Sequence, residues 1–310
     1  MKKILITGGL GYIGRVLINL LNPNDKIIIM DNLSYNQNPK EIFKNLKNIN
    51  FIEGDVRDQN LIKKVTKDID FIIPLAGLVG APLCKKKPLD AKEINQDSIK
   101  MLCKIISKDA KIIIPTTNSG YGIGSKNSFC TEQSPINPIS IYGITKMNAE
   151  KYVLDKGNSI SLRLATVFGL SPRMRLDLLV NNFCYLALTK GKIEIFEGHF
   201  RRNFVHINDV ARVFLFCMEN FSKLKNNVYN FGLEEANLTK LELANKIKKY
   251  LPSFQILENE FEKDPDQRDY IVSNKKIMAT GFKFRTSLDQ GIKELIEEIP
   301  KLTQKNFSNI

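Results

Sequence analysis

A glycine-rich turn near the N-terminus constrains the fold of this chain more than any other feature. Glycines stand at 8, 11 and 14, directly after an apolar run at Lys3–Thr7 and at the start of a helical pattern at 13–21. In such a strand–turn–helix unit the first glycine permits a tight turn, the second lets the backbone approach a pyrophosphate, and the third lets the helix pack against the strand. The helix N-terminus then faces the phosphates. The turn therefore predicts a dinucleotide site, with contacts from Gly8, Gly11, Tyr12, Ile13 and Gly14.

The chain continues with an alternation of short apolar strands and longer helical patterns. Further strands are predicted at Lys26–Asp31, 51–53, 70–74, 111–116 and Ser159–Leu164, and helices at 58–67, 90–107, 140–154, 174–190, 208–220, 239–250 and 288–298. Strands that are nearly continuous in Ile, Val and Leu are typical of a parallel sheet covered on both faces. We therefore predict an α/β fold, in which a Rossmann-type doubly wound parallel sheet spans residues 1–165. A smaller C-terminal substrate-binding lobe is predicted over residues 166–310, with interleaved boundaries.

Composition limits the class of protein and its partners. The chain has 310 residues, of which 43% are apolar, so a large core is possible. No apolar run approaches the ~18 residues of a transmembrane helix, and five dispersed cysteines without a C-x-x-C pair fit a reducing cytosol. The net charge of +13 comes from scattered lysines. We therefore expect a cytoplasmic protein with no membrane or nucleic-acid partner, and a mild attraction for anions such as a diphosphate.

The end of the second predicted strand indicates which dinucleotide binds. Asp31 ends this strand, and Asn32, Leu33 and Ser34 follow it without a basic residue. A carboxylate at this position can bind the adenosine ribose hydroxyls and repels a 2′-phosphate. An aspartate that only caps a turn is the alternative. The register of Asp31 with the glycine-rich turn favours NAD over NADP.

A Y-x-x-x-K pattern at the start of the predicted helix at 140–154 suggests acid–base chemistry. Tyr142 and Lys146 lie one helical turn apart, and a free phenol has a pKa near ~10, too high for a base at neutral pH. A neighbouring ammonium should lower that pKa, so that Tyr142 can accept the proton of a hydroxyl while hydride leaves the same carbon. Lys146 could also bind the nicotinamide ribose. The same pattern describes many exposed helix pairs, and its position after the glycine-rich unit is what favours catalysis.

The segment after the predicted strand at 111–116 completes the catalytic set. Residues 115–122 read PTTNSGYG and resemble the S-S-x-x-V-Y-G segment of extended short-chain dehydrogenases/reductases, with threonine in the serine positions. Thr117 matches the catalytic serine, and its hydroxyl would hold the reacting oxygen and its developing charge. An ordinary threonine at a strand end is the alternative.

Nearly the full chain resembles the nucleotide-sugar epimerase/dehydratase family within this group. The resemblance implies cofactor contacts from Asn32, Asp55, Val56, Leu75, Ala76 and Gly77, with Asn95 steadying the last segment. It also implies substrate contacts from Asn118, Thr166, Asn182, Arg202 and Arg268, although the family has asparagine where Thr166 stands. The two arginines would bind the nucleotide diphosphate in bidentate fashion, and a surface salt bridge is the alternative for each. No metal is implied, since the two histidines, His199 and His206, have no cysteine partners.

Departures from the family pattern narrow the predicted chemistry. Dehydratases of the family carry an Asp-Glu pair directly after the catalytic threonine, whereas Asn118 and Ser119 occupy those positions here. Elimination of water would therefore lack its acid and base. The decarboxylases and 3,5-epimerases of the family carry Glu or Cys there, which are also absent. What remains is oxidation and reduction at one sugar carbon, expected to be C4, by a 4-epimerase or a 4-dehydrogenase.

Three stretches resemble a more specific subgroup, associated with capsular and other surface polysaccharides. These are 79–84 (VGAPLC), 118–124 (NSGYGIG) and 165–180 (ATVFGLSPRMRLDLLV). The subgroup includes a GDP-heptose 4-dehydrogenase, which implies tightly bound NAD/NADH and a 2-oxo acid as a hydride acceptor. The family resemblance further implies a homodimer or higher homo-oligomer through the helix of Tyr142 and that at 90–107. A non-catalytic dinucleotide-binding protein is a remote alternative, because Tyr142 and Lys146 are both retained.

Overall fold

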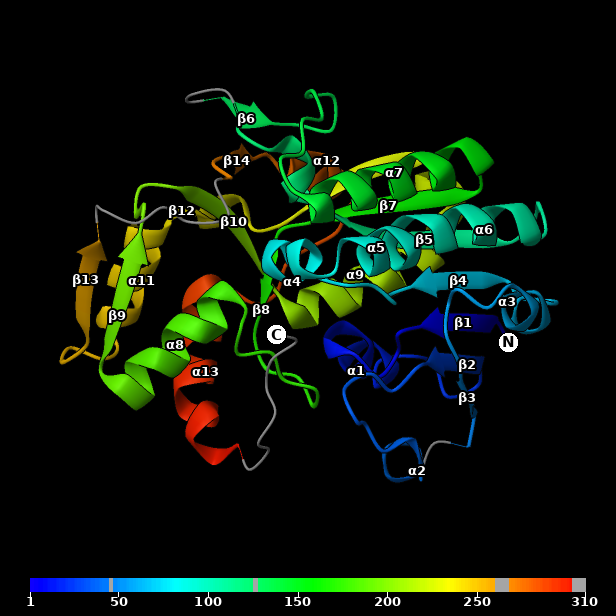
Figure 1. The fold of residues 1–310 in the computed structure, drawn as a ribbon, viewed down its shortest axis with the longest axis horizontal. Coiled ribbons are helices and arrows are strands. Elements are labelled where there is room, and N and C mark those ends of the chain that lie inside the picture. The colour runs from blue at the N-terminus through cyan, green and yellow to red at the C-terminus, as the bar shows by residue number, and fades with distance from the viewer. Residues whose placement is uncertain (45–46, 125–127, 260–267, 303–310) are drawn as a thin grey trace.

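The computed structural model describes residues 1–44, 47–124, 128–259 and 268–302. Its centre is a seven-stranded parallel sheet in the order β11-β7-β5-β4-β1-β2-β3 (Figure 1). The strands are β1 (Lys3–Thr7), β2 (Lys26–Asp31), β3 (Ile49–Glu53), β4 (Phe71–Pro74), β5 (Lys111–Thr117), β7 (Ser159–Leu164) and β11 (Asn227–Phe231). The order reverses between β1 and β4, as in a doubly wound sheet. The predicted Rossmann-type fold is therefore confirmed.

Helices cover both faces of this sheet, as the apolar character of its strands predicts. One face packs on α3 (Gln59–Val65), α6 (Ser98–Ile105) and α7 (Ile141–Lys156), and the other on α1 (Tyr12–Ile18), α9 (Ile207–Glu219), α10 (Phe221–Leu224) and α12 (Lys275–Ala279). Alternate strand residues serve the two cores: Leu5 faces the first, and Ile4 and Ile6 face the second. Three short helices, α2 (Pro39–Ile42), α4 (Ala81–Lys86) and α5 (Pro88–Lys92), lie in the connecting segments. None of the helices in the described ranges is both long and apolar enough to span a membrane.

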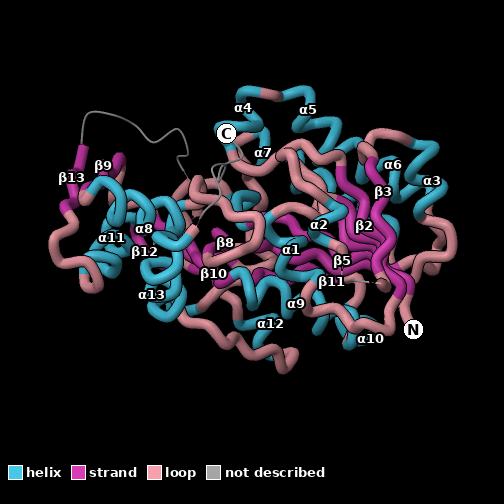
Figure 2. Tube along the Cα trace, turned by 90° about the horizontal axis from the view of Figure 1, so that it is seen from below, coloured by secondary structure: helices cyan, strands magenta, loops and turns pink. Residues whose placement is uncertain are grey.

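A second group of elements lies beside the carboxyl end of the sheet (Figures 1 and 2). It contains α8 (Leu179–Lys190), α11 (Lys240–Lys248) and α13 (Leu288–Glu298), which share one core with the strands next to them. Its strands are β8 (Thr166–Phe168), β10 (Arg201–His206) and β12 (Asn237–Thr239) in one sheet, and β9 (Lys192–Phe196) and β13 (Gln255–Asn259) in another. A further pair joins β6 (Phe129–Cys130) to β14 (Ile271–Val272).

The chain passes between the two groups more than once. Strand β11, from the second half of the sequence, pairs in parallel with β7 and forms one edge of the large sheet. Helix α9, also from the second half, packs against α1. Neither half of the sequence therefore builds the large sheet and its covering helices by itself.

Two predicted helices differ from the structure. The helix predicted at 90–107 is interrupted by a π-helical turn at Glu93–Asp97, which leads into α6. The helix predicted at 174–190 begins only at Leu179, so the prediction is wrong for its first five residues. There, side-chain amides from α8 hold the backbone out of the helix: Asn181 Nδ2 donates to the carbonyl of Arg175 at 2.9 Å, and Asn182 Nδ2 to that of Leu176 at 3.0 Å.

Candidate active site

A cavity of about 730 Å³ lies at the carboxyl ends of the parallel strands, where their order reverses. Ligands of open α/β sheets bind in this kind of crevice. Most of the residues predicted from sequence line it: Gly8, Gly11, Tyr12, Ile13, Gly14, Asp31, Asn32, Asp55, Val56, Leu75, Ala76, Gly77, Thr117, Tyr142, Lys146, Thr166, Asn182, Arg202 and Arg268. Asn95 and Asn118 are the two predicted site residues that do not.

The glycine-rich turn forms one wall of the cavity, and its shape excludes larger residues. Gly8 has φ +66°, and a Cβ there would lie 2.5 Å from the backbone nitrogen of Ala76. A Cβ on Gly14 would lie 2.3 Å from the carbonyl oxygen of Gly9. Gly11 is less confined, with its nearest neighbour, the Gly8 carbonyl oxygen, at 3.2 Å. Gly8 and Gly14 are therefore required by close backbone packing, which gives the turn the compact shape that a dinucleotide diphosphate requires.

Two acidic residues line the cavity next to this turn. The carboxylate of Asp31 accepts the backbone N–H groups of Leu10 and Leu33, each at 3.0 Å. Burial raises the pKa of Asp31, against the opposing effect of these backbone bonds. Asp55 accepts two hydrogen bonds from the Arg57 guanidinium, at 3.0 and 2.8 Å, which lower the pKa of Asp55. The glycine cradle and the Asp31 carboxylate at the end of β2 together fit the adenosine half of NAD.

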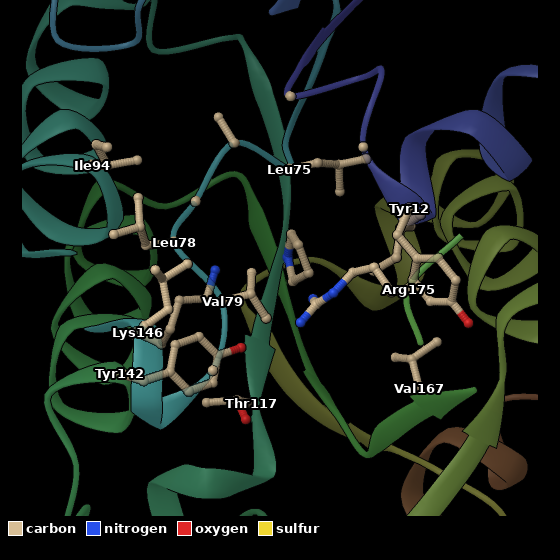
Figure 3. A pocket seen from close by; sticks show the side chains of 18 of the residues that line it. Tyr12, Leu75, Leu78, Val79, Ile94, Thr117, Tyr142, Lys146, Val167 and Arg175 are labelled. Carbon is tan, nitrogen blue, oxygen red and sulfur yellow. The ribbon is translucent and has the colours of Figure 1, made fainter. Parts of the chain in front are cut away.

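Helix α7 brings the predicted catalytic residues to one side of the cavity. Ser140 caps the helix by accepting the N–H of Gly143 at 3.1 Å, which places Tyr142 in the first turn and Lys146 one turn later. Figure 3 shows the Tyr142 hydroxyl beside Thr117, with Lys146 above the ring in this view. Thr117 comes from the end of β5, whose residues pair with β7. The parallel sheet and α7 therefore bring together the three residues predicted to be catalytic.

The electrostatics of this cluster correct one prediction. Burial raises the pKa of Tyr142 to about 12, while Arg268, Thr117 and Arg175 act to lower it. Burial also lowers the pKa of Lys146 to about 8, and Lys146 is not among the principal groups that act on the phenol. The net direction of the Tyr142 pKa is therefore opposite to the expected one, because desolvation of the phenol outweighs the charges that favour the phenolate. Oxidised nicotinamide, when bound, supplies a positive charge that favours the phenolate.

The buried Lys146 should make the stability of the cofactor-free protein increase with pH. Its pKa is about 8 in the folded protein and near 10.5 in the unfolded chain, so the unfolded chain binds more protons between these values. We expect the free energy of unfolding to rise by about 2 kcal/mol between pH ~7.5 and ~9.5 from this group alone. Urea unfolding of wild type and Lys146→Met at both pH values measures the difference. An equal pH dependence in the two proteins would contradict it.

A hydroxyl network extends from Thr117 towards the segment that follows β5. The Oγ1 atom of Thr117 lies 2.8 Å from Oγ of Ser119 and accepts the Ser119 N–H at 3.1 Å. Arg268 in turn donates a hydrogen bond to Oγ of Ser119. Ser119 was not among the residues predicted from the sequence as site residues. It links the predicted diphosphate arginine to the predicted catalytic hydroxyl.

The two asparagines outside the cavity are fully buried. Asn95 donates to the carbonyl of Leu78 and accepts its N–H, both at 2.9 Å, so it would act on a cofactor through the segment at 75–78. Asn118 is only 1% exposed, and neither polar atom of its amide has a hydrogen-bond partner within the described ranges. Thr117 caps the 3₁₀ turn at Asn118–Tyr121, which directs Asn118 into the interior. In this conformation the Asn118 side chain does not reach the cavity and cannot contact a substrate there.

Beyond the predicted set, several further polar side chains line the cavity: Tyr35, Arg173, Arg175, Asp177 and Lys240. Arg173 and Arg175 lie in the 165–180 stretch. The sequence resemblance of this stretch assigns no role to either arginine. The sequence feature that could have indicated a site here is the pair of arginines, separated by one residue, that follows Pro172.

Among the predicted substrate residues, Arg202 is buried, with 3% of its surface exposed. It donates a hydrogen bond to the carbonyl of Arg201 at 2.9 Å.

A buried ion pair lies next to the side of the cavity that Thr117 and Tyr142 line. Glu150 of α7 and Arg163 of β7 meet at 2.6 Å, and each side chain is only 6% exposed. Glu150 also accepts hydrogen bonds from the hydroxyls of Thr116 at 3.0 Å and Ser161 at 2.6 Å. Arg163 donates to the hydroxyl of Tyr121 at 3.0 Å. One carboxylate thus joins α7 to β5 and β7, next to Thr117.

Known proteins resemble this chain over most of its length. The model of the NAD dependent epimerase/dehydratase family matches residues 4–232. A putative UDP-glucose 4-epimerase from Methanocaldococcus jannaschii is 26% identical, over 94% of this chain and 97% of its own length. A trifunctional UDP-glucose 4,6-dehydratase/UDP-4-keto-6-deoxy-D-glucose 3,5-epimerase/UDP-4-keto-L-rhamnose-reductase from Arabidopsis thaliana is 27% identical over 96% of this chain. The present chain spans 47% of that relative's length.

Solved structures show the same architecture. UDP-glucuronic acid 4-epimerase from Bacillus cereus, in complex with NAD and a UDP-4-deoxy-4-fluoro-glucuronic acid, superposes with a TM-score of 0.85. The two chains are 23% identical, and the match covers 96% of this chain and 99% of the other. At this level of identity the likeness concerns the fold.

Proposed function

The chain belongs to the NAD dependent epimerase/dehydratase family, and from this premise we propose that it is an NAD-dependent oxidoreductase acting at C4 of a nucleotide-activated sugar. One observation carries the proposal: Thr117, Tyr142 and Lys146 line a cavity that also contains Arg202 and Arg268. A hydroxyl-activating group and cations suited to a diphosphate therefore share one space. That combination suits a sugar whose ring reacts while its nucleotide is held by the phosphates.

In the proposed reaction, Tyr142 would accept the proton of the sugar C4 hydroxyl, and NAD, when bound, would supply the acceptor for the C4 hydride. Thr117 holds the reacting oxygen through its hydroxyl, which Ser119 orients from 2.8 Å. Lys146 stands one turn from Tyr142 and would hold the nicotinamide ribose. Arg202 and Arg268 would bind the diphosphate, so that C4 is presented to Tyr142.

The residues after Thr117 favour simple oxidation over loss of water. Elimination needs an acid and a base near the carbons next to C4, and family dehydratases supply these with carboxylates. Here Asn118 is a buried neutral amide, and Ser119 is hydrogen-bonded to both Thr117 and Arg268. Neither group titrates near neutral pH. We therefore infer a 4-keto sugar that is either released or reduced again at the same carbon.

At the finer level, we propose a 4-dehydrogenase of a GDP-heptose in surface polysaccharide biosynthesis, such as capsule formation. The three stretches at 79–84, 118–124 and 165–180 support this proposal, and two of them contribute residues to the cavity wall. A dehydrogenase that keeps its cofactor bound needs a second substrate to reoxidise NADH, and a 2-oxo acid would take the hydride. A 4-epimerase of a UDP- or GDP-sugar is the alternative, in which the hydride returns to the opposite face of the keto sugar.

Product analysis on defined sugar nucleotides tests the proposal. Denatured protein is assayed for released NAD or NADH, and native protein is incubated with UDP-, GDP- and dTDP-sugars, including a GDP-heptose, with and without 2-oxoglutarate. Loss of two hydrogens at C4, detected by mass and NMR, is the result expected for the dehydrogenase. Unchanged mass with inverted C4 identifies the epimerase. Bound cofactor without change in any of these sugars would argue against the proposal and for a non-catalytic dinucleotide-binding protein.

We also propose a homodimer, built on α7 and the helical segment at 90–107. Ile144, on α7, is 44% exposed and would be covered in such a dimer. Met101 and Cys103 are partly exposed on α6. Light scattering of wild type and Ile144→Glu measures the assembly, and the variant should shift towards the monomer.

A further inference from the structure

The segment between β8 and α8, here called the strap (residues 169–178), crosses next to the cavity and is tied to the glycine-rich turn. The Tyr12 hydroxyl donates to the carbonyl of Gly169 at 2.6 Å, and the Ser171 hydroxyl donates to the carbonyl of Tyr12 at 2.8 Å. Asn181 closes the arrangement: its Oδ1 accepts the N–H of Gly169 at 3.0 Å, and its Nδ2 donates to the Tyr12 hydroxyl at 3.2 Å. The strap is therefore held against the turn predicted to receive a dinucleotide.

Two arginines of the strap line the cavity although both are buried. Arg173 and Arg175 are 8% and 6% exposed. The guanidinium of Arg173 lies over the ring of Tyr35, 4.6 Å from its centroid, and Tyr35 also lines the cavity, four residues after Asp31. Figure 3 shows the Arg175 side chain next to Tyr12 and directed towards the side of Tyr142. The strap thus carries two cations from the adenosine side of the cavity to its centre.

The ion pair of Arg175 leaves part of its guanidinium for a ligand. Asp177 accepts from Nε at 3.2 Å and from Nη2 at 2.5 Å. A guanidinium has five N–H donors, and the Nη1 group has no hydrogen-bond acceptor among the residues that the structure describes. The carboxylate fixes the plane of the guanidinium, as is typical where an arginine is prepared for an anion. Asp177 itself repels an anion, but Arg173 and Arg175 together leave the strap cationic.

We propose that Arg173 and Arg175 form a second anion-binding element of the dinucleotide site, in which Arg175 binds the diphosphate of NAD beside the glycine-rich turn and Arg173 closes the adenosine end against Tyr35. The diphosphate of the cofactor is favoured over that of a sugar nucleotide because the strap is bonded to Tyr12 of the turn. The arginines expected for the substrate, Arg202 and Arg268, come from other parts of the chain. The strap would therefore slow the release of NADH and keep it bound between turnovers.

The test measures cofactor release from the full-length, NADH-loaded protein. Dissociation is followed by the fluorescence of bound NADH after addition of excess NAD, in wild type, Arg175→Gln and Arg173→Gln. We expect release about 10- to 100-fold faster in Arg175→Gln, because a charge-assisted bond is lost, and a smaller increase in Arg173→Gln. Arg212→Gln is the matched control, since Arg212 pairs with Asp209 and does not line the cavity, and its release rate should equal that of wild type.

Binding of GDP and UDP to the NADH-loaded proteins, measured by calorimetry, distinguishes the two sources of diphosphate. Unchanged affinity for both nucleotides together with fast NADH release supports the proposal. If NADH release is as slow as in wild type while GDP or UDP binding is weakened, Arg175 binds the substrate and the proposal is wrong. The proposal is also wrong if neither measurement changes. If circular dichroism shows that Arg175→Gln is unfolded, the variants Arg175→Lys and Arg173→Gln supply the same comparison. No measurement depends on turnover, so failure of the proposed sugar oxidation would leave this test intact.

Discussion

Turnover of the Tyr142→Phe variant should be about 10²- to 10⁴-fold lower than that of wild type, with bound NAD retained. Phenylalanine fills the same half-buried space beside Thr117 but cannot accept the proton of the sugar hydroxyl. Cofactor binding should persist because the glycine-rich turn, Asp31 and Lys146 are unchanged. The measurements are initial rates on the sugar nucleotide identified by product analysis, and the amount of NAD released per protein on denaturation.

Tyr152→Phe is the matched control for this substitution. Tyr152 lies on the same helix, half-buried, with the ammonium of Lys100 5.4 Å from the ring centroid, and it does not line the cavity. Its loss of a hydroxyl should leave the rate unchanged. A Tyr142→Phe variant that retains the wild-type rate would exclude Tyr142 as the base.

In wild type, the rate should increase with pH as the phenol of Tyr142 loses its proton. Burial raises the pKa of Tyr142 to about 12 before any cofactor charge acts on it.

The Glu150→Ala variant should lose about 3–5 kcal/mol of unfolding free energy. The substitution leaves the Arg163 guanidinium buried without its carboxylate, and it removes the acceptor of the Thr116 and Ser161 hydroxyls. Uncompensated buried charge is far more costly than the loss of an exposed pair. Urea unfolding of the cofactor-free protein measures the change. Because α7 carries Tyr142 and Lys146, the variant should also turn over more slowly at temperatures where it remains folded.

An exposed ion pair and a double variant provide the controls. Glu298→Ala removes the partner of Lys301 on the surface, where the side chains are 41% and 65% exposed, and should cost less than about 1 kcal/mol. Glu150→Leu combined with Arg163→Leu removes both buried charges. We expect the double variant to be more stable than the summed losses of the single variants Glu150→Leu and Arg163→Leu indicate. Additive losses would mean that the two side chains do not interact as the 2.6 Å separation implies.

The large sheet and the nucleotide turn were predictable because their signals are local and periodic. Strands β1, β2 and β7 have the residue bounds expected from sequence. The first two contain continuous apolar runs, and β7 alternates Ile and Leu with polar residues. Gly8 and Gly14 were predictable for the same reason: their roles depend on contacts within one strand–turn–helix unit and its neighbouring strand. α13 likewise occupies 288–298 as predicted, starting from a capping serine, Ser287.

Features that depend on contacts between distant segments were not predictable. Residues 174–178 of the strap are predicted to be helical from sequence, yet the strap consists of bends and turns. Hydrogen bonds with Tyr12, about 160 positions earlier, and with Asn181 hold this conformation. The direction of the Tyr142 pKa depends on burial, which a Y-x-x-x-K spacing does not report. The inward orientation of Asn118 follows from a 3₁₀ turn capped by Thr117. In each case a tertiary environment outweighs the local pattern.

The position of β11 at the edge of the sheet affects how the protein is made. During synthesis the ribosome completes residues 1–165 well before β11 (Asn227–Phe231) and α9 exist. Until then the edge of β7 lacks its partner, and the apolar face that α9 covers is exposed to solvent. A nascent chain in this state would be prone to pair with other chains, so chaperone capture is most valuable in that interval. For the same reason, a truncated nucleotide-binding half is a poor candidate for expression, whereas a chain continued through residue 231 includes every strand of the sheet.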